Sequence, residues 1–126
     1  MGWMKRVLLA EDNPVNQRVL LAFVRKLGFQ VTLADDGHEA VRIFEAEGAD
    51  LILMDCNMPD MDGLEATRRI REMETARGLT PTPIIAVTAH ASGSSAEQCR
   101  AAGMNDHIPK PIMFDALRDM MERWSR

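Results

Sequence analysis

A short apolar run that ends in a carboxylate constrains the fold of this chain more than any other feature. Residues 51–54 are all apolar, and they are followed directly by Asp55 and then by a loop that contains Pro59 and Gly63. An unbroken apolar run between turn signals is typical of a strand buried on both faces, as in a parallel sheet. Ligands bind at the carboxyl ends of such strands. Asp55 is therefore predicted to lie at a ligand-binding edge.

Two similar apolar runs, at residues 7–10 and 84–87, an alternating segment at 29–33 and a weak strand signal at 106–108 alternate with segments of helical spacing. The predicted strands are residues 7–10, 29–33, 51–54, 84–87 and 106–108. Five repeats of strand then helix predict a parallel sheet with helices on both faces. For five strands the common order is 2-1-3-4-5, with a switch point between strands 1 and 3. The fold class is thus predicted to be α/β, a doubly wound five-stranded sheet flanked by five helices.

Capping residues and helix-ending glycines indicate the limits of the predicted helices. Asn13-Pro14 begins the first helix, whose apolar spacing includes Val15 and Val19, and Gly28 ends it. The second follows residues 35–37 and closes at Gly48, and the third begins at residues 62–63 with its arginines mostly outward. A short fourth helix precedes Gly103, and the last is predicted to carry an apolar stripe of Met113, Leu117, Met120 and Trp124.

Length and charge narrow the classes of function. With 126 residues the chain is predicted to be one domain, residues 5–125, after a short leader at 1–4. A net charge of −4 argues against a nucleic-acid or membrane partner, and the apolar runs are too short to cross a bilayer. Without a signal peptide, Cys56 and Cys99 are expected to be reduced thiols in a cytoplasmic protein. The ten methionines are expected to fill the core.

The predicted order places several polar side chains at one edge of the sheet. Glu11 and Asp12 follow the first strand, Asp55 the third, Thr88 the fourth, and Lys110 the fifth. Three neighbouring carboxylates repel one another, and oxygen ligands of this kind suit Mg²⁺. An aspartate can also act as a nucleophile and form an acyl phosphate. Transfer then needs alignment and charge neutralisation, which Mg²⁺, Lys110 and the Thr88 hydroxyl can supply.

At these residues the chain resembles the response-regulator receiver domains of two-component phosphorelays, which have a flavodoxin-like fold. The matching segments are distributed over almost the whole chain, and their sequences are most similar to those of the receivers of hybrid histidine kinases. They are residues 11–13, 54–63, 87–89, 101–103 and 110–111.

The resemblance implies a set of roles. Asp55 is expected to accept a phosphoryl group from a histidine kinase or a histidine phosphotransfer protein. Asp12, Asp55 and the backbone carbonyl of Asn57 would bind Mg²⁺, with Glu11 acting through water. The oxygens of the phosphoryl group would be bound by Thr88, Ala89 and Lys110. Apart from promoting its own phosphorylation and dephosphorylation, the domain is not expected to be an enzyme.

Switching and partner binding are also implied by the resemblance. His107 occupies the position where the family usually has Tyr or Phe, and its imidazole is expected to swing inward when Asp55 is phosphorylated. A downstream protein is expected to bind the face formed by the fourth helix, fifth strand and fifth helix. The bond before Pro111 is predicted to be cis, against a base rate of about 5–6%, because Lys110 must turn back toward the carboxylates.

Other classes of protein fit the sequence less well. A dehalogenase-type phosphatase would need a second aspartate where Asn57 stands, and a flavodoxin-type phosphate loop would be opposed by Glu11 and Asp12. No GxGxxG or GxxxxGK[ST] motif is present. The remaining alternative is a docking scaffold with the same fold that never carries phosphate. Mg²⁺-dependent labelling by acetyl phosphate distinguishes the two.

Overall fold

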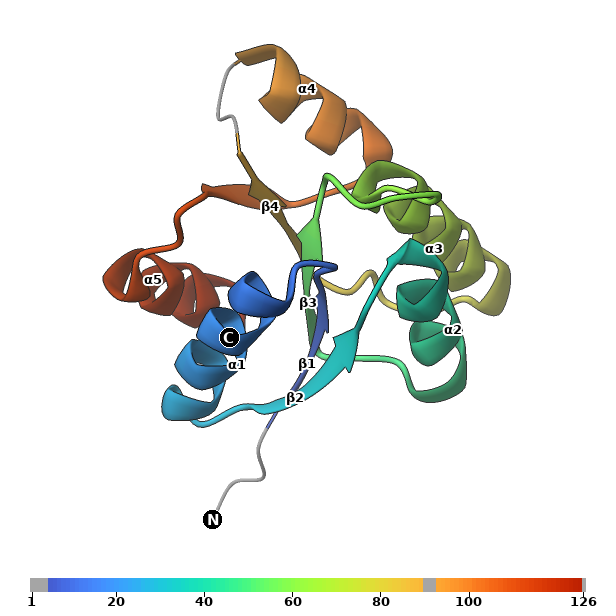
Figure 1. Ribbon diagram of the computed structural model, residues 1–126. Helices are drawn as coiled ribbons and strands as arrows, with labels where there is room; N and C mark the ends of the chain where they lie inside the picture. Colours follow the sequence, from blue (N-terminus) through green and yellow to red (C-terminus); the bar gives the residue numbers. More distant parts are fainter. Residues whose placement is uncertain (1–4, 90–92, 126) are drawn as a thin grey trace.

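Five parallel strands form one sheet in the order β2-β1-β3-β4-β5. A computed structural model describes residues 5–89 and 93–125; the leader predicted at residues 1–4 lies outside the described residues. The predicted sheet and strand order are confirmed (Figure 1), and each strand limit differs from the predicted one by at most one residue. The strands are β1 (Arg6–Ala10), β2 (Gln30–Ala34), β3 (Leu51–Asp55), β4 (Ile84–Thr88) and β5 (Asp106–Pro109).

Five helices connect the strands, and within the described residues three of them begin with a side-chain cap. Asn13 accepts hydrogen bonds from the backbone N–H groups of the first turn of α1, and Asp36 and Asp62 do the same for α2 and α3. These caps satisfy N–H groups that have no partner within the helix. The helices are α1 (Pro14–Lys26), α2 (Gly37–Glu47), α3 (Gly63–Arg77), α4 (Gly93–Ala102) and α5 (Phe114–Trp124).

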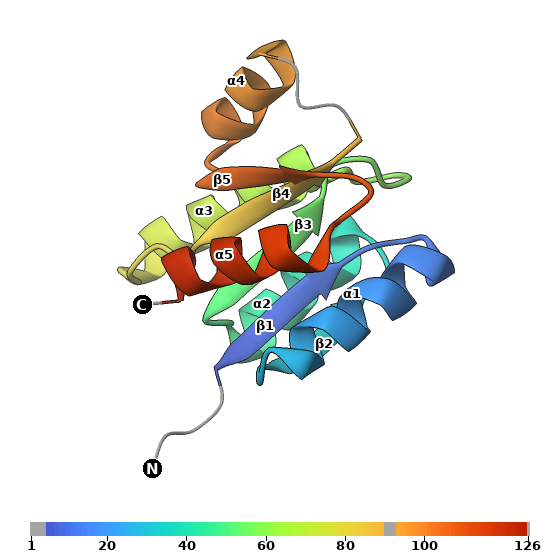
Figure 2. The ribbon, with the colours of Figure 1, turned by 90° about the vertical axis from the view of Figure 1, so that its left-hand side faces the viewer.

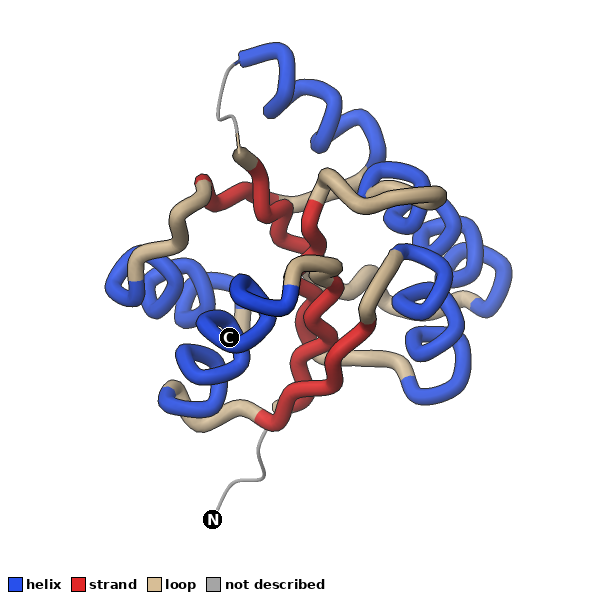
Figure 3. Tube along the Cα trace, viewed as in Figure 1, coloured by secondary structure: helices blue, strands red, loops and turns tan. Residues whose placement is uncertain are grey.

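The helices lie on both faces of the sheet and bury two separate apolar clusters. As Figures 1 and 2 show, α1 and α5 cover one face, α2 and α3 the other, and α4 projects away from the body of the molecule. The strands run through the middle of the tube drawing in Figure 3. Since β3 and β4 are buried along their whole length, their residues can be apolar on both faces, which explains their unbroken apolar sequence.

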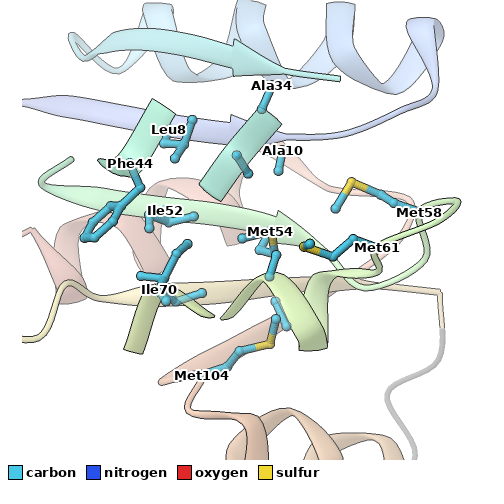
Figure 4. Packing of buried hydrophobic residues seen from close by; sticks show 14 of the residues in the cluster. Leu8, Ala10, Ala34, Phe44, Ile52, Met54, Met58, Met61, Ile70 and Met104 are labelled. Carbon is cyan, nitrogen blue, oxygen red and sulfur yellow. The ribbon is translucent and has the colours of Figure 1, made fainter. Parts of the chain in front are cut away.

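Methionines hold the loop after β3 against the core. Met58 and Met61 are buried in the cluster that also contains Met54 and Met104 (Figure 4), as the core role predicted for methionine requires. Met113, which is 66% exposed, departs from that prediction. A close backbone contact fixes the end of the same loop: a Cβ atom on Gly63 would lie 2.2 Å from the carbonyl oxygen of Asp55. The loop is thereby held tightly against the residue that ends β3.

Two details of the helices differ from the sequence prediction. Arg71 does not point outward; it donates hydrogen bonds to the buried carboxylate of Glu74 at 2.7 Å and to the carbonyl of Gly103 at 2.9 Å. On α5, Leu117 and Met121 are the buried residues, whereas Met113 precedes the helix and is 66% exposed. The predicted apolar stripe included Met120, which is only partly buried, where the structure buries Met121 instead.

None of the described helices has the length and apolar character that a membrane span requires.

Candidate functional site

Three carboxylates meet where β1 and β3 end. Glu11 directly follows β1, and Asp55 is the last residue of β3; Ala10 pairs with Met54 in the parallel register, so the two strand ends are level. With Asp12 they form a cluster in which one carboxylate oxygen from each residue lies within 4.8 Å of the others. Asp12 is exposed, whereas Glu11 and Asp55 are buried. The carboxylates that the sequence places at this edge are thus brought together.

Lys110 reaches the cluster from the end of β5. Its ammonium Nζ donates to Asp55 Oδ2 at 3.0 Å and lies 3.5 Å from Glu11 Oε1. Burial lowers the pKa of Lys110, but the hydrogen bond and charge of Asp55, and then those of Glu11, outweigh it and raise the pKa overall. Lys110 therefore stays positively charged. The peptide bond between Lys110 and Pro111 is cis, the isomer expected from the sequence.

The buried Glu11 carboxyl is the most perturbed group of the cluster. Burial raises its pKa from 4.5 to about 7; the Asn13 backbone N–H opposes this shift, while the charge of Asp55 adds to it. Asn13 N donates to Glu11 Oε2 at 3.0 Å, but Glu11 Oε1 has no hydrogen-bond partner among the described residues. The Lys110 ammonium, 3.5 Å from Glu11 Oε1, is shared between Glu11 and Asp55, so three ionised carboxylates at this edge leave negative charge that a further cation can neutralise.

The donor set fits Mg²⁺. All three side chains offer carboxylate oxygens, and the accessible Asp12 leaves the cluster open to solvent on one side. Magnesium is usually held by a few carboxylates while it keeps several waters. Asn57 follows in the turn after Asp55 and donates its backbone N–H to Asp55 Oδ1 at 3.0 Å. This hydrogen bond fixes the orientation of the Asp55 carboxylate.

Thr88 and Ala89 lie on the other side of Asp55. Thr88 ends β4 with 6% of its surface exposed, and its carbonyl accepts from Lys110 N at 2.8 Å, which links the ends of β4 and β5. Ala89 is an exposed residue in the bend that follows β4. The sequence-predicted residues therefore converge on the edge formed by β1, β3, β4 and β5.

His107 lies apart from the carboxylates, on the side of β5 that faces α4. It pairs with Ala86 in the register, two residues before Thr88, and is half-buried. Together with Ala96 and Arg100 of α4, it lines a cavity of about 100 Å³. His107 thus contributes nothing to the acidic cluster directly.

Two features near the site were missed by sequence reasoning. On α1, Val15 and Val19 are 67% and 40% exposed, because Leu20 and Val24 form the buried face of that helix. Beside Val19, a second cavity of about 120 Å³ is lined by both Glu11 and Lys110. The spacing of Val15 and Val19 indicates a helix but cannot tell its buried face from an apolar exposed one.

The second missed feature is a contact between the two cysteines. Cys56 Sγ, directly after Asp55, lies 3.6 Å from Cys99 Sγ of α4. Burial, followed by the proximity of Cys99, raises the pKa of the Cys56 thiol, so it is neutral in the resting protein. The two cysteines are 43 positions apart, and the sequence gave no signal of this pairing.

A parallel sheet of this order, with buried acids and a lysine at its carboxyl edge, defines a class of α/β proteins that bind a cation and a phosphoryl group at the strand ends. The sequence profile of the response regulator receiver domain matches residues 7–122. The chain therefore belongs to the response regulator receiver domain family, and it is a receiver domain of two-component signal transduction.

Relatives and solved structures agree with this assignment. The chain is 37% identical over 120 residues to the sensor histidine kinase GacS of Pseudomonas protegens, covering 95% of this chain but 13% of that protein. The receiver domain of the sensor histidine kinase PA1611 from Pseudomonas aeruginosa, solved with a magnesium ion in its active-site cleft, is 47% identical, with a TM-score of 0.87 and 98% of both chains covered.

A third comparison is with a complex. The receiver domain of the yeast response regulator Ssk1, crystallised with the histidine phosphotransfer protein Ypd1 of Saccharomyces cerevisiae, is 35% identical, with a TM-score of 0.92 over 97% of this chain and 89% of that one.

Proposed function

We propose that Asp55 is the phosphoacceptor of this receiver domain and that it takes a phosphoryl group from phosphohistidine in the presence of Mg²⁺. One observation carries the proposal: the buried Asp55 carboxylate lies among two further carboxylates and accepts a hydrogen bond from the Lys110 ammonium at 3.0 Å. In the reaction a carboxylate oxygen attacks phosphorus, the bond from phosphorus to the donor imidazole nitrogen breaks, and an acyl phosphate forms.

The surrounding residues are assigned roles from their positions. Asp12, Asp55 and the backbone carbonyl of Asn57 would hold Mg²⁺, with Glu11 acting through water, and the bound cation would neutralise charge on the incoming phosphoryl oxygens. The PA1611 receiver, solved with magnesium in its cleft, supports this assignment.

Groups on the other side of Asp55 receive the phosphoryl oxygens. The Lys110 ammonium is already directed at the Asp55 carboxylate, so it can pair with a phosphoryl oxygen after a small movement. The Thr88 hydroxyl and the backbone of Ala89 bind the remaining oxygens from the end of β4. We assign these two roles from the family resemblance together with the position of β4 next to β3.

The phosphodonor is proposed to be a histidine kinase or a histidine phosphotransfer protein that docks beside the acidic cluster. Three exposed apolar side chains, Val15, Val19 and Met113, come from α1 and the segment before α5, which flank Glu11 and Lys110. Exposed apolar residues that gather around a site favour a protein partner. The complex of Ypd1 with the Ssk1 receiver supports a partner of this class.

The output surface is proposed to be the face made by α4, β5 and α5, with His107 as its switch residue. His107 faces α4 across a cavity, and a ring at this position can respond to movement at the end of β4. Reversing the charges of Arg100 and Arg118, which lie on the two helices of this face, should weaken phosphorylation-dependent binding of a downstream partner. Binding that survives both reversals would place the partner elsewhere.

The wider context is also a proposal. We infer that residues 5–125 form the receiver domain after a leader at 1–4, and that the domain belongs to a cytoplasmic hybrid histidine kinase or acts beside one. The chain spans about an eighth of the length of the kinase relatives that it matches, and those relatives supply the support. The domain is not proposed to catalyse any reaction beyond its own phosphorylation and dephosphorylation.

A phosphotransfer assay tests the donor proposal. A histidine phosphotransfer protein that carries a labelled phosphoryl group is mixed with wild type, with Val15→Glu, and with Leu79→Glu as the matched control. Leu79 is also an exposed apolar residue, at 47%, but it precedes β4 at the opposite edge of the sheet. Val15→Glu should slow transfer at least about tenfold and leave acetyl phosphate labelling unchanged. Equal transfer to all three proteins would refute docking at this surface.

A further inference from the structure

The two cysteines of the chain form a pair that the receiver chemistry described above does not use. The sequence contains only Cys56 and Cys99. Cys56 directly follows the proposed phosphoacceptor in the loop between β3 and α3, and Cys99 is a buried residue of α4. Their sulfur atoms are 3.6 Å apart, so the fold brings together two thiols from elements separated by β4 and α3 in the sequence.

The thiol pair is accessible from one side. A cavity of about 260 Å³ between the loop and α4 is lined by both cysteines and by Asn57, Thr88 and Gln98. Cys56 is half-buried, so a small reagent that enters this cavity meets it first. A disulfide has a sulfur–sulfur distance of about 2.05 Å, so the two sulfurs must approach by about 1.5 Å. Side-chain rotation and a small movement of α4 can supply this.

We propose that Cys56 and Cys99 are a reversible dithiol–disulfide site that, when oxidised, ties α4 covalently to the loop that follows Asp55. The oxidant class is a low-molecular-weight disulfide. One cysteine sulfur attacks a sulfur of the small disulfide and releases one small thiol, which takes up the cysteine's proton. The second cysteine then attacks the mixed disulfide and releases the other small thiol with the second proton. The protein loses two hydrogens, and the small disulfide gains them.

The second step favours the internal disulfide over a lasting mixed one. Once one cysteine carries the small thiol, the other sulfur is already a close neighbour, and no second encounter in solution is needed. A thiol pair that merely fills space in the core would lack this behaviour. It would remain as two thiols or accumulate the mixed disulfide.

The consequence of the bond follows from where α4 sits. In Figures 1 and 2 α4 projects from the body of the molecule, and its C-terminal end is attached through buried Ala102 and through the hydrogen bond from Arg71 to Gly103. A disulfide at Cys99 adds an attachment beside Asp55 and Thr88. If Asp55 is the phosphoacceptor, as proposed above, the oxidised form has its phosphorylation site and part of its output face joined by a covalent bond.

Mass spectrometry of the whole chain tests the bond itself. The reduced protein is treated with oxidised glutathione, or with diamide as a two-electron thiol oxidant, and then alkylated with N-ethylmaleimide. The expected product is a monomer that has lost two hydrogens and takes up no alkyl group, with one cross-linked peptide containing Cys56 and Cys99. The ratio of internal to mixed disulfide should be at least about ten times higher in the folded protein than in urea, and dithiothreitol should reverse the bond.

Single variants and a functional readout complete the test. Cys56→Ser and Cys99→Ser should each either take up one alkyl group or carry one mixed disulfide, and neither should form an internal disulfide. A wild type that retains both thiols, or that gives only mixed disulfides or dimers, overturns the proposal. Amide hydrogen exchange should slow in α4 of the oxidised protein, and unchanged exchange would refute the tether. Acetyl phosphate labelling of the reduced protein is measured separately, so failure of the phosphoacceptor proposal is distinguishable from failure of the disulfide.

Discussion

Replacement of Glu11 by glutamine should make the stability of the metal-free protein depend differently on pH. Burial, with a further contribution from the charge of Asp55, raises the pKa of Glu11 from 4.5 to about 7. The folded protein therefore holds a proton on Glu11 in a pH range where the unfolded chain has lost it. The stability from this proton is present below about pH 4.5 and is lost as the pH rises through about 7.

The size of the effect follows from the two pKa values. One pKa unit corresponds to about 1.4 kcal/mol, so ionising Glu11 in the folded, metal-free protein costs about 3 kcal/mol of unfolding free energy. Glutamine at this position has no such titration. The unfolding free energy of Glu11→Gln minus that of wild type should thus increase by about 3 kcal/mol between about pH 4.5 and pH 8.

Urea unfolding in the presence of a chelator, followed by circular dichroism at both pH values, measures this difference. Saturating Mg²⁺ should stabilise wild type more at the higher pH, because the cation binds ionised carboxylates and competes with the proton. A difference between variant and wild type that is the same at both pH values would refute the reasoning. So would a difference that shrinks as the pH rises.

Two further substitutions test how the site is supported. Gly63→Ala places a Cβ atom 2.2 Å from the carbonyl oxygen of Asp55. It should therefore lower the unfolding free energy, measured by urea unfolding, by about 2 kcal/mol, and it should weaken Mg²⁺ binding, measured by calorimetry. Unchanged Mg²⁺ affinity would count against the close contact. Glu74→Gln removes the charge that pairs with Arg71 at 2.7 Å and keeps an acceptor for Thr82 N. It should lower the unfolding free energy by about 2 kcal/mol and leave Mg²⁺ affinity unaltered. A decrease in unfolding free energy below about 0.5 kcal/mol would show that the ion pair behaves as an exposed one.

The arrangement of the sheet edge was predictable because it depends on backbone topology. The apolar runs at residues 7–10, 51–54 and 84–87 are each followed directly by a polar residue, which is Glu11, Asp55 or Thr88. Once the strands are parallel and ordered 2-1-3-4-5, their carboxyl ends must share one edge, and the meeting of Glu11 with Asp55 follows. No side-chain detail enters this argument, which is why one sequence sufficed for it.

Features that depend on packing between helices could not be predicted in the same way. Arg71 has the spacing of an exposed residue, yet it is drawn inward by Glu74 and the Gly103 carbonyl, which come from positions set by the tertiary fold. The exposure of Val15 depends on the rotation of α1 about its axis, since neighbouring apolar positions compete for the core. The Cys56–Cys99 contact depends on where α4 is placed against the β3–α3 loop.

The protonation state of Glu11 could not be predicted from the sequence either. The sequence indicates that three carboxylates meet, but the pKa of each one depends on how completely it is buried and on which atoms face it. In the folded protein, burial and the charge of Asp55 raise the pKa of Glu11, while the Asn13 backbone N–H and the charge of Lys110 lower it. The balance among these contributions is set by distances that only the folded structure gives.

Labelling by acetyl phosphate tests the central claim most directly. Wild type and Asp55→Asn are incubated with acetyl phosphate, with and without Mg²⁺, then reduced with borohydride, which converts an aspartyl phosphate to homoserine, and analysed by peptide mass. The phosphoacceptor assignment predicts conversion at Asp55 in wild type, only with Mg²⁺, and none in the variant. Equal labelling of both proteins, or labelling of wild type that is independent of Mg²⁺, would contradict it.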